Sequence, residues 1–107
     1  MAKLEKTLNG NFNQIIQNIE EGILNGSASA TLEESSNFIS VDARCSVRVF
    51  ERFSYSGGNR VSMNVTLFGK GDTIHISAIT SGGSQAMFFK INTFGEEAFF
   101  DKLREIL

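Results

Sequence analysis

Alternation of apolar and polar positions with a period of two dominates the middle of the chain and predicts β-strands. The pattern runs over residues 43–52, 60–67 and 73–78. Ser56-Gly57-Gly58-Asn59 and Gly69-Lys70-Gly71-Asp72 separate these segments and are typical of tight turns. We therefore expect three consecutive antiparallel strands joined by hairpins.

Weaker strand patterns lie on either side of this region. Residues 2–8 alternate and predict a first strand, although Lys6 interrupts the apolar positions and a helical turn is the alternative. Residues 28–33 predict another strand, and the polar stretch 34–42 is expected to be a loop. Residues 86–91 are apolar apart from Lys90 and predict a short strand covered on both faces.

Two segments change to a period near 3.6 and predict helices. The first has an apolar stripe preceded by Asn11, a good N-cap with Gln14 three residues on. Its members are Phe12, Ile15, Ile16, Ile19 and Ile23. The second helix follows Thr93, which forms a capping box with Glu96. Its apolar stripe is Phe99, Phe100, Leu103, Ile106 and Leu107.

These elements predict an α+β fold, a two-layer sandwich in the order β-α-β-β-β-β-α. An antiparallel meander sheet of five or six strands is about 24–29 Å wide, and two helices side by side cover about 20 Å of it. We expect the N-terminal and C-terminal helices on one face, above Val47, Val65 and Ile76. Residues 1–107 are expected to form a single domain.

The face without helices is then expected to carry a row of arginines. Arg44, Arg48 and Arg52 alternate with the apolar positions, about 13 Å apart from one to the next. Guanidinium groups bind carboxylates and phosphates well. The candidate anion-binding or partner-binding residues are Arg44, Arg48, Arg52, Arg60, Asn64 and His75. The alternative is that the arginines only form surface ion pairs with acids such as Glu33 and Glu51.

Three apolar residues are predicted to lie on this same arginine-bearing face. Strict alternation places Phe50, Phe68 and Ile79 there. Large apolar side chains among polar ones on a flat sheet are typical of a protein interface. They are therefore candidate interface residues, and the predicted partner is a second copy of the chain.

The composition of the chain argues against several classes of function. The net charge of −2 argues against a general nucleic-acid binder, although residues 43–70 hold five basic residues and one acid. Cys45 is the only cysteine and is expected in the core, so no internal disulfide forms and a cytoplasmic location is favoured. No apolar run is long enough for a membrane span.

The residues give little support to catalysis, a metal site or a cofactor. His75 and Ser77 are two positions apart on a strand, about 6.5 Å, which is too far for direct activation of a nucleophile. One histidine and one cysteine, expected on opposite faces, do not make a zinc site. Ser81-Gly82-Gly83-Ser84 is either a turn or an anion cradle, and it lacks the lysine of a P-loop.

Residues 43–60, 77–91 and 92–100 resemble a family of small bacterial proteins classed as a domain of unknown function, and the resemblance extends over nearly the whole chain. It implies a bacterial origin and brings no activity or ligand. The end of the chain, with Phe-Gly-Glu-Glu-Ala before the last helix, is also similar to other small bacterial sandwich proteins. That similarity concerns the fold only.

Two functional hypotheses follow from these observations. The first is a non-enzymatic binding module that uses the exposed sheet face, with a homodimer as the expected assembly. The second is a small-molecule binding protein with a cavity between helices and sheet for an apolar or anionic ligand. The phenylalanines that would line such a cavity or, more simply, fill the core are Phe12, Phe53, Phe88, Phe89, Phe99 and Phe100.

Overall fold

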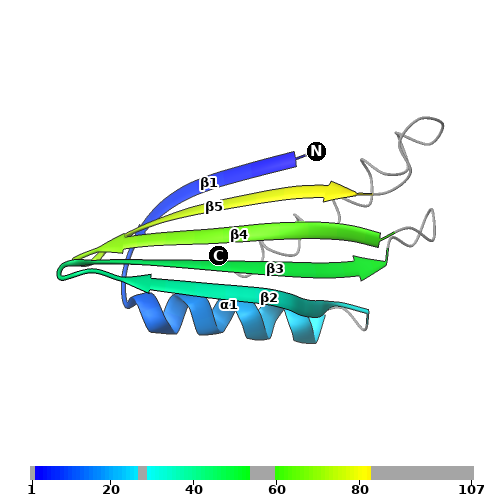
Figure 1. The fold of residues 1–107 in the computed structure, drawn as a ribbon, viewed down its shortest axis with the longest axis horizontal. Helices are drawn as coiled ribbons and strands as arrows, with labels where there is room; N and C mark the ends of the chain where they lie inside the picture. Colours follow the sequence, from blue (N-terminus) through cyan, green and yellow to red (C-terminus); the bar gives the residue numbers. More distant parts are fainter. Residues whose placement is uncertain (1, 27–28, 54–59, 83–107) are drawn as a thin grey trace.

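The computed structural model describes residues 2–26, 29–53 and 60–82 (Figure 1). They form an antiparallel sheet and one helix. The elements in chain order are β1 (Ala2–Asn9), α1 (Phe12–Gly26), β2 (Thr31–Ile39), β3 (Ala43–Phe53), β4 (Arg60–Lys70) and β5 (Thr73–Gly82). This confirms an α+β fold built on an antiparallel sheet.

The five strands are ordered β1-β5-β4-β3-β2. Strands β2 to β5 form the predicted meander, and β1 pairs with β5 on the far side of the sheet from β2. The helix α1 therefore carries the chain from one edge of the sheet to the other. The predicted turn between β4 and β5 is also present, with Gly71 at a φ of +61° that suits glycine.

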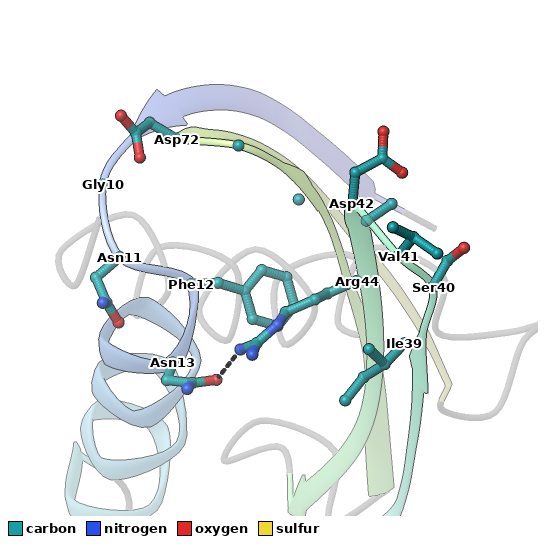
Figure 2. Close-up of a pocket in the computed structure, with 13 residues that line it drawn as sticks. Gly10, Asn11, Phe12, Asn13, Ile39, Ser40, Val41, Asp42, Arg44 and Asp72 are labelled. Atoms are coloured by element: carbon teal, nitrogen blue, oxygen red, sulfur yellow. Dashed lines mark hydrogen bonds between the residues drawn. The ribbon is translucent and has the colours of Figure 1, made fainter.

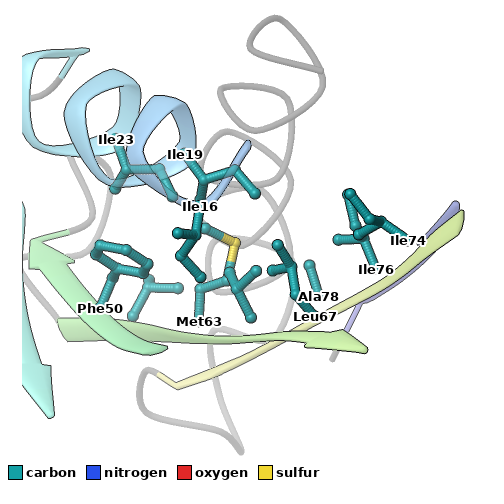
Figure 3. Packing of buried hydrophobic residues seen from close by; sticks show 11 residues of the cluster. Ile16, Ile19, Ile23, Phe50, Met63, Leu67, Ile74, Ile76 and Ala78 are labelled. Carbon is teal, nitrogen blue, oxygen red and sulfur yellow. The ribbon is translucent and has the colours of Figure 1, made fainter. Parts of the chain in front are cut away.

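The helix α1 begins and packs as its sequence predicts. The side-chain Oδ1 of Asn11 accepts a hydrogen bond of 2.9 Å from the backbone N–H of Gln14, which caps the first turn. Ile16, Ile19 and Ile23 are buried against the sheet. Figure 3 shows these isoleucines above Phe50 and Met63, so the core lies between α1 and one face of the sheet.

Strands β4 and β5 turn the predicted residues toward this core. Val61, Met63, Val65 and Leu67 of β4 are fully buried, and Ile74, Ile76 and Ala78 of β5 are at most 2% exposed. The expectation that Val65 and Ile76 lie inside is therefore confirmed. We call this side of the sheet the helix face and the opposite side the open face.

Strand β3 faces the other way from the prediction. Its period of two is confirmed, but Arg48 is only 8% exposed and Phe50 is 0% exposed, whereas Val47 is half-buried. The register explains this result, because Arg48 pairs with Val65 and Phe50 with Met63, and directly paired residues point to the same side. Arg48 and Phe50 thus lie on the helix face, while Val47 lies on the open face.

The predicted loop over residues 34–42 is wrong for most of its length. Residues 34–39 belong to β2 and pair with β3, with a register shift between Leu32 and Glu34. Every residue of β2 is exposed. An edge strand of this kind needs no apolar face, because the backbone hydrogen bonds to β3 hold it in place.

The predicted strand at 86–91 and the predicted C-terminal helix after Thr93 lie outside the described residues.

We predict that the two faces differ in their contribution to stability. Replacement of the fully buried Phe50 by alanine should lower the free energy of unfolding by about 3–5 kcal/mol, because it leaves a cavity between α1 and the sheet. The matched substitution Phe38→Ala removes a ring that is 64% exposed and should cost less than about 1 kcal/mol. Urea denaturation of both variants measures the difference, and equal losses would contradict the assignment of the faces.

Candidate functional site

The arginines of β3 lie beneath or beside the helix. The Nε of Arg48 donates a hydrogen bond of 2.6 Å to Oε2 of Glu20 on α1. The Nη1 of Arg48 also donates to the backbone oxygens of Ser36 and Val47, at 3.2 and 3.0 Å. This network satisfies a nearly buried guanidinium, so Arg48 joins the helix to the sheet and is not available to an external anion.

The remaining candidate arginines are divided between the two faces. Arg52 is buried on the helix face, and its Nε donates to the backbone oxygen of Phe53. Arg60 is on the open face near one end of the sheet, where its Nε donates to Oε1 of Glu51 at 2.7 Å and its Nη2 lies 3.7 Å from Glu33. Asn64 and His75 are exposed on the open face.

The expected anion-binding set is therefore not one surface. Arg44, Arg48 and Arg52 are on the helix face, whereas Arg60, Asn64 and His75 are on the open face. The expected interface set is also split, since Phe50 is in the core. Phe68 and Ile79, at 45% and 40% exposure, remain on the open face as predicted.

Arg44 lines an open pocket of about 560 Å³ at one end of the sheet (Figure 2). Three connections surround it: the β1–α1 junction at Gly10, the β2–β3 turn at 40–42 and the β4–β5 turn at Gly71. The apolar Ile39 and Val41 form part of its wall. The pocket thus brings together short segments that are far apart in the chain.

Arg44 is held in place inside this pocket by neutral groups. Its Nη1 donates to Oδ1 of Asn13 at 2.8 Å, and its guanidinium carbon lies 5.8 Å from the centre of the Phe12 ring. Gly69 makes room for that ring, since a Cβ at position 69 would lie 2.6 Å from Phe12 Cδ2. The guanidinium is therefore oriented without being neutralised by a carboxylate among the described residues.

The acidic residues of the pocket are at its rim. Figure 2 shows Asp42 and Asp72 at the edge of the opening, pointing away from the Arg44 guanidinium. Asp42 lies 3.7 Å from the ammonium group of Lys70. Among the described residues that line the pocket, Arg44 is the basic one, and Asp42 and Asp72 are the acidic ones.

The open face carries a band of uncharged side chains along its three central strands. The register places Cys45, Val47 and Val49 of β3 on this face, beside Asn64, Thr66 and Phe68 of β4 and His75, Ser77 and Ile79 of β5. The expectation that Cys45 belongs to the core is wrong, since its side chain is half-buried on this face. The open face thus carries valines of β3 where the sequence pattern had predicted arginines.

Phe68 and His75 occupy the middle of this band. Their rings stack with centroids 6.3 Å apart, and Nδ1 of His75 lies 3.0 Å from Oγ1 of Thr7. A shallow hollow of about 340 Å³ adjoins them, between β1, β5 and β4. The band is therefore uneven, with the Phe68 ring next to a depression.

On the open face, Cys45 and His75 do not form a nucleophile–base pair, and the described residues form no group of metal ligands. Cys45 and His75 share the face but lie two strands apart, about 10 Å, which is too far for a thiolate–imidazole pair. Within residues 2–26, 29–53 and 60–82, no three His, Cys, Asp or Glu side chains are grouped as metal ligands would be. Gly82 ends β5 at a φ of +136°, and Gly83 and Ser84 of the glycine-rich segment lie outside the described residues.

Comparison with known proteins identifies a family. The model of a family described as being of unknown function, DUF6054, matches residues 1–107. The chain belongs to this family. A search of curated proteins found no match. The match covers the full length of the chain and supports the resemblance seen in the sequence. It assigns no activity.

In the described part of the chain, the one helix falls short of the length and apolar character that crossing a membrane requires.

We predict that Arg48 and Glu20 act as a structural pair. Glu20→Leu should lower the free energy of unfolding by about 1–3 kcal/mol, because it leaves a nearly buried guanidinium with only backbone acceptors. The double substitution Glu20→Leu/Arg48→Met should recover most of that loss, since it removes both charges. Urea denaturation measures each value.

Glu21 provides the control for this pair. It is the next residue on α1, it is exposed, and Glu21→Leu should change stability by about 0.5 kcal/mol or less. If Glu20→Leu proves as mild as Glu21→Leu, the pair does not hold α1 on the sheet.

Proposed function

We propose that the protein is a non-enzymatic interaction module that associates with a second copy of itself through its open face. The observation that carries the proposal is the distribution of charge on this face. Its nine central residues, three each from β3, β4 and β5, include no Asp, Glu, Lys or Arg. A neutral centre can meet an identical surface without repulsion between like charges.

The charged residues of the open face lie around this centre. Lys3 and Glu5 are on the edge strand β1, and Glu34 is on the edge strand β2. Glu51 and Arg60 form an ion pair at the end where β3 and β4 meet. An apolar or neutral centre with a charged rim is the usual anatomy of a protein interface.

The size of the open face also suits a dimer. The sheet has five strands of 8 to 11 residues. At about 4.8 Å between strands and about 3.3 Å per residue, one face covers roughly 750 Å². A stable interface of standard size buries about 800 Å² per partner. The whole open face is thus close to the size of a standard interface.

The proposal includes a bacterial cytoplasm as the setting. It rests on the resemblance described above and on Cys45 as the only cysteine, which suits a reducing compartment. A half-buried free thiol on a surface of this kind is protected when a second copy covers it.

We predict that Phe68→Glu converts a dimer to a monomer. The substitution places two like charges in the desolvated centre of the interface, one from each copy, and should weaken association by at least about 100-fold. Light scattering over a range of concentrations measures the assembly. Asn25→Glu adds the same charge to the exposed side of α1 and should leave the dimer intact.

Thiol labelling of Cys45 gives a second readout of the same event. In the wild-type protein the labelling rate should rise as the sample is diluted, and in Phe68→Glu it should be high at every concentration. A wild-type chain that scatters as a monomer at all concentrations would overturn the proposal.

The pocket around Arg44 favours a second candidate function, the binding of a small carboxylic acid with an apolar body. The observation behind it is an oriented guanidinium without a carboxylate partner among the described residues, in a pocket that also includes the exposed apolar side chains of Ile39 and Val41. A volume of about 560 Å³ is within the range of small-molecule sites. The acidic rim disfavours dianions such as phosphate.

We predict that benzoate binds in this pocket with a dissociation constant of about 1 mM. Backbone amide signals of Gly10 and Gly71 should shift saturably in heteronuclear NMR spectra. Arg44→Gln should weaken binding by about tenfold or more, because it removes a charge-assisted hydrogen bond.

Benzyl alcohol is the neutral control for benzoate and should produce no saturable shift. Phe68→Glu should leave benzoate binding unchanged, which separates this site from the dimer. Equal binding to the wild type and to Arg44→Gln would eliminate the second candidate.

A further inference from the structure

The register of the sheet arranges the open face in straight rows that cross all five strands. One row runs from Lys3 on β1 through Ile79, Asn64 and Val49 to Glu34 on β2. It therefore begins at one edge with Lys3, whose ammonium group lies 3.9 Å from the Glu5 carboxylate on the same strand, and ends with the negative charge of Glu34 at the other edge. The three residues between them are uncharged.

Two further rows run parallel to the first. The next consists of Glu5, Ser77, Thr66, Val47 and Ser36, and the one after it of Thr7, His75, Phe68, Cys45 and Phe38. In all three rows β4 supplies the middle residue. The open face thus extends by two strands on either side of β4. The charges and the side-chain sizes differ between these two sides.

Two identical sheets that meet face to face are related by a two-fold axis in the plane between them. Sheets packed in the aligned manner keep their strands within about 30° of each other. The axis then runs either along the strands or across them. An axis along β4 places β1 of each copy opposite β2 of the other, whereas an axis across the strands places β1 opposite β1.

We propose that the two copies are related by a two-fold axis parallel to β4, so that Lys3 of each copy faces Glu34 of the other. This inference rests on the proposed function and specifies its geometry. Each row then meets the reversed copy of itself, which pairs Lys3 with Glu34 and Ile79 with Val49. The symmetric dimer contains two such ion pairs, one at each side edge.

The contacts along β4 agree with this arrangement. Phe68 of one copy meets Phe68 of the other at the axis, in the middle of the third row. Aromatic pairs across an interface contribute stabilisation beyond their buried area. The axis thus passes through Phe68, a large apolar side chain that is 45% exposed.

The side-chain shapes at the ends of the third row are also complementary. Phe38 is 64% exposed on β2, and Thr7 and His75 line the hollow on the β1 side. The axis along β4 sets the projecting Phe38 ring of one copy over the hollow of the other. A projecting ring and a depression on one surface match in this way only when opposite edges meet.

The alternative axis loses the charge match at the β2 edge. If it ran across the strands, β1 would lie over β1, where Lys3 of one copy can face Glu5 of the other. Glu34 would face β2, which carries no basic residue in Thr31–Ile39. Opposite charges therefore meet across the interface at both edges only when the axis follows β4.

Charge reversal at the two edges tests the geometry. Lys3→Glu and Glu34→Lys should each weaken dimerisation by about tenfold at low ionic strength, because each places like charges opposite one another twice. The double variant Lys3→Glu/Glu34→Lys should restore the wild-type affinity. Analytical ultracentrifugation measures the dissociation constants.

Lys6 supplies the matched control. It lies on β1 three residues after Lys3, it is exposed, and it points to the helix face because it pairs with Ile76. Lys6→Glu makes the same change in charge and should not alter dimerisation.

The outcomes separate the geometry from the proposed function. Rescue by the double variant supports the axis along β4. If the wild type dimerises and Phe68→Glu abolishes the dimer, but the edge variants behave like Lys6→Glu, the axis is wrong and the proposed function stands. A monomeric wild type overturns both.

Discussion

The register between β3 and β4 is the constraint on which the other features of the molecule depend. Arg48 pairs with Val65, so the even-numbered residues of β3 share a side with the apolar residues of β4. A shift of one position would move every side chain of β3 to the other face. That shift would take Phe50 out of the core and bring Val47 and Val49 into it. Both surfaces discussed above follow from this pairing.

The same register explains where α1 lies. Two arginines of β3 reach the helix, Arg44 at Asn13 before the isoleucine stripe and Arg48 at Glu20 within it. The apolar face of α1 determines how closely the helix packs on the sheet, and these polar contacts determine its position along β3. Arg48 needs Glu20 because a guanidinium that is only 8% exposed is costly without a carboxylate. Arg44 is exposed, so an amide and an aromatic ring are sufficient for it.

Sequence reasoning predicted the elements better than the face of β3. The helix, its Asn11 cap and the hairpin strands could be predicted because each depends on local pattern. Which residues of β3 face the helix depends on the pairing of β3 with β4. The paired residues Phe53 and Arg60 have an even number of residues between them, so the even-numbered residues of β3 lie opposite the odd-numbered residues of β4. A tight two-residue turn at Gly57-Gly58 also leaves an even number of residues between paired positions. The predicted turn therefore already implied which face of β3 packs against the helix. Placing Val65 inside then requires Arg48 inside, whatever the polarity of β3. The polar strand β2 could not be found this way because it has no apolar alternation and is held by backbone pairing with β3. The pocket of Arg44 could not be found because it joins segments that are far apart in the chain.

The open face and the Arg44 pocket are two consequences of one strand. Neighbouring residues of β3 point to opposite sides, so Arg44 enters the pocket while Cys45 joins the open face. A second copy docked on the open face therefore leaves the guanidinium accessible, and a bound acid leaves the neutral centre unchanged. The two proposed activities are therefore compatible in one chain. Any coupling between them would pass through the backbone of β3, which lies between β2 and β4.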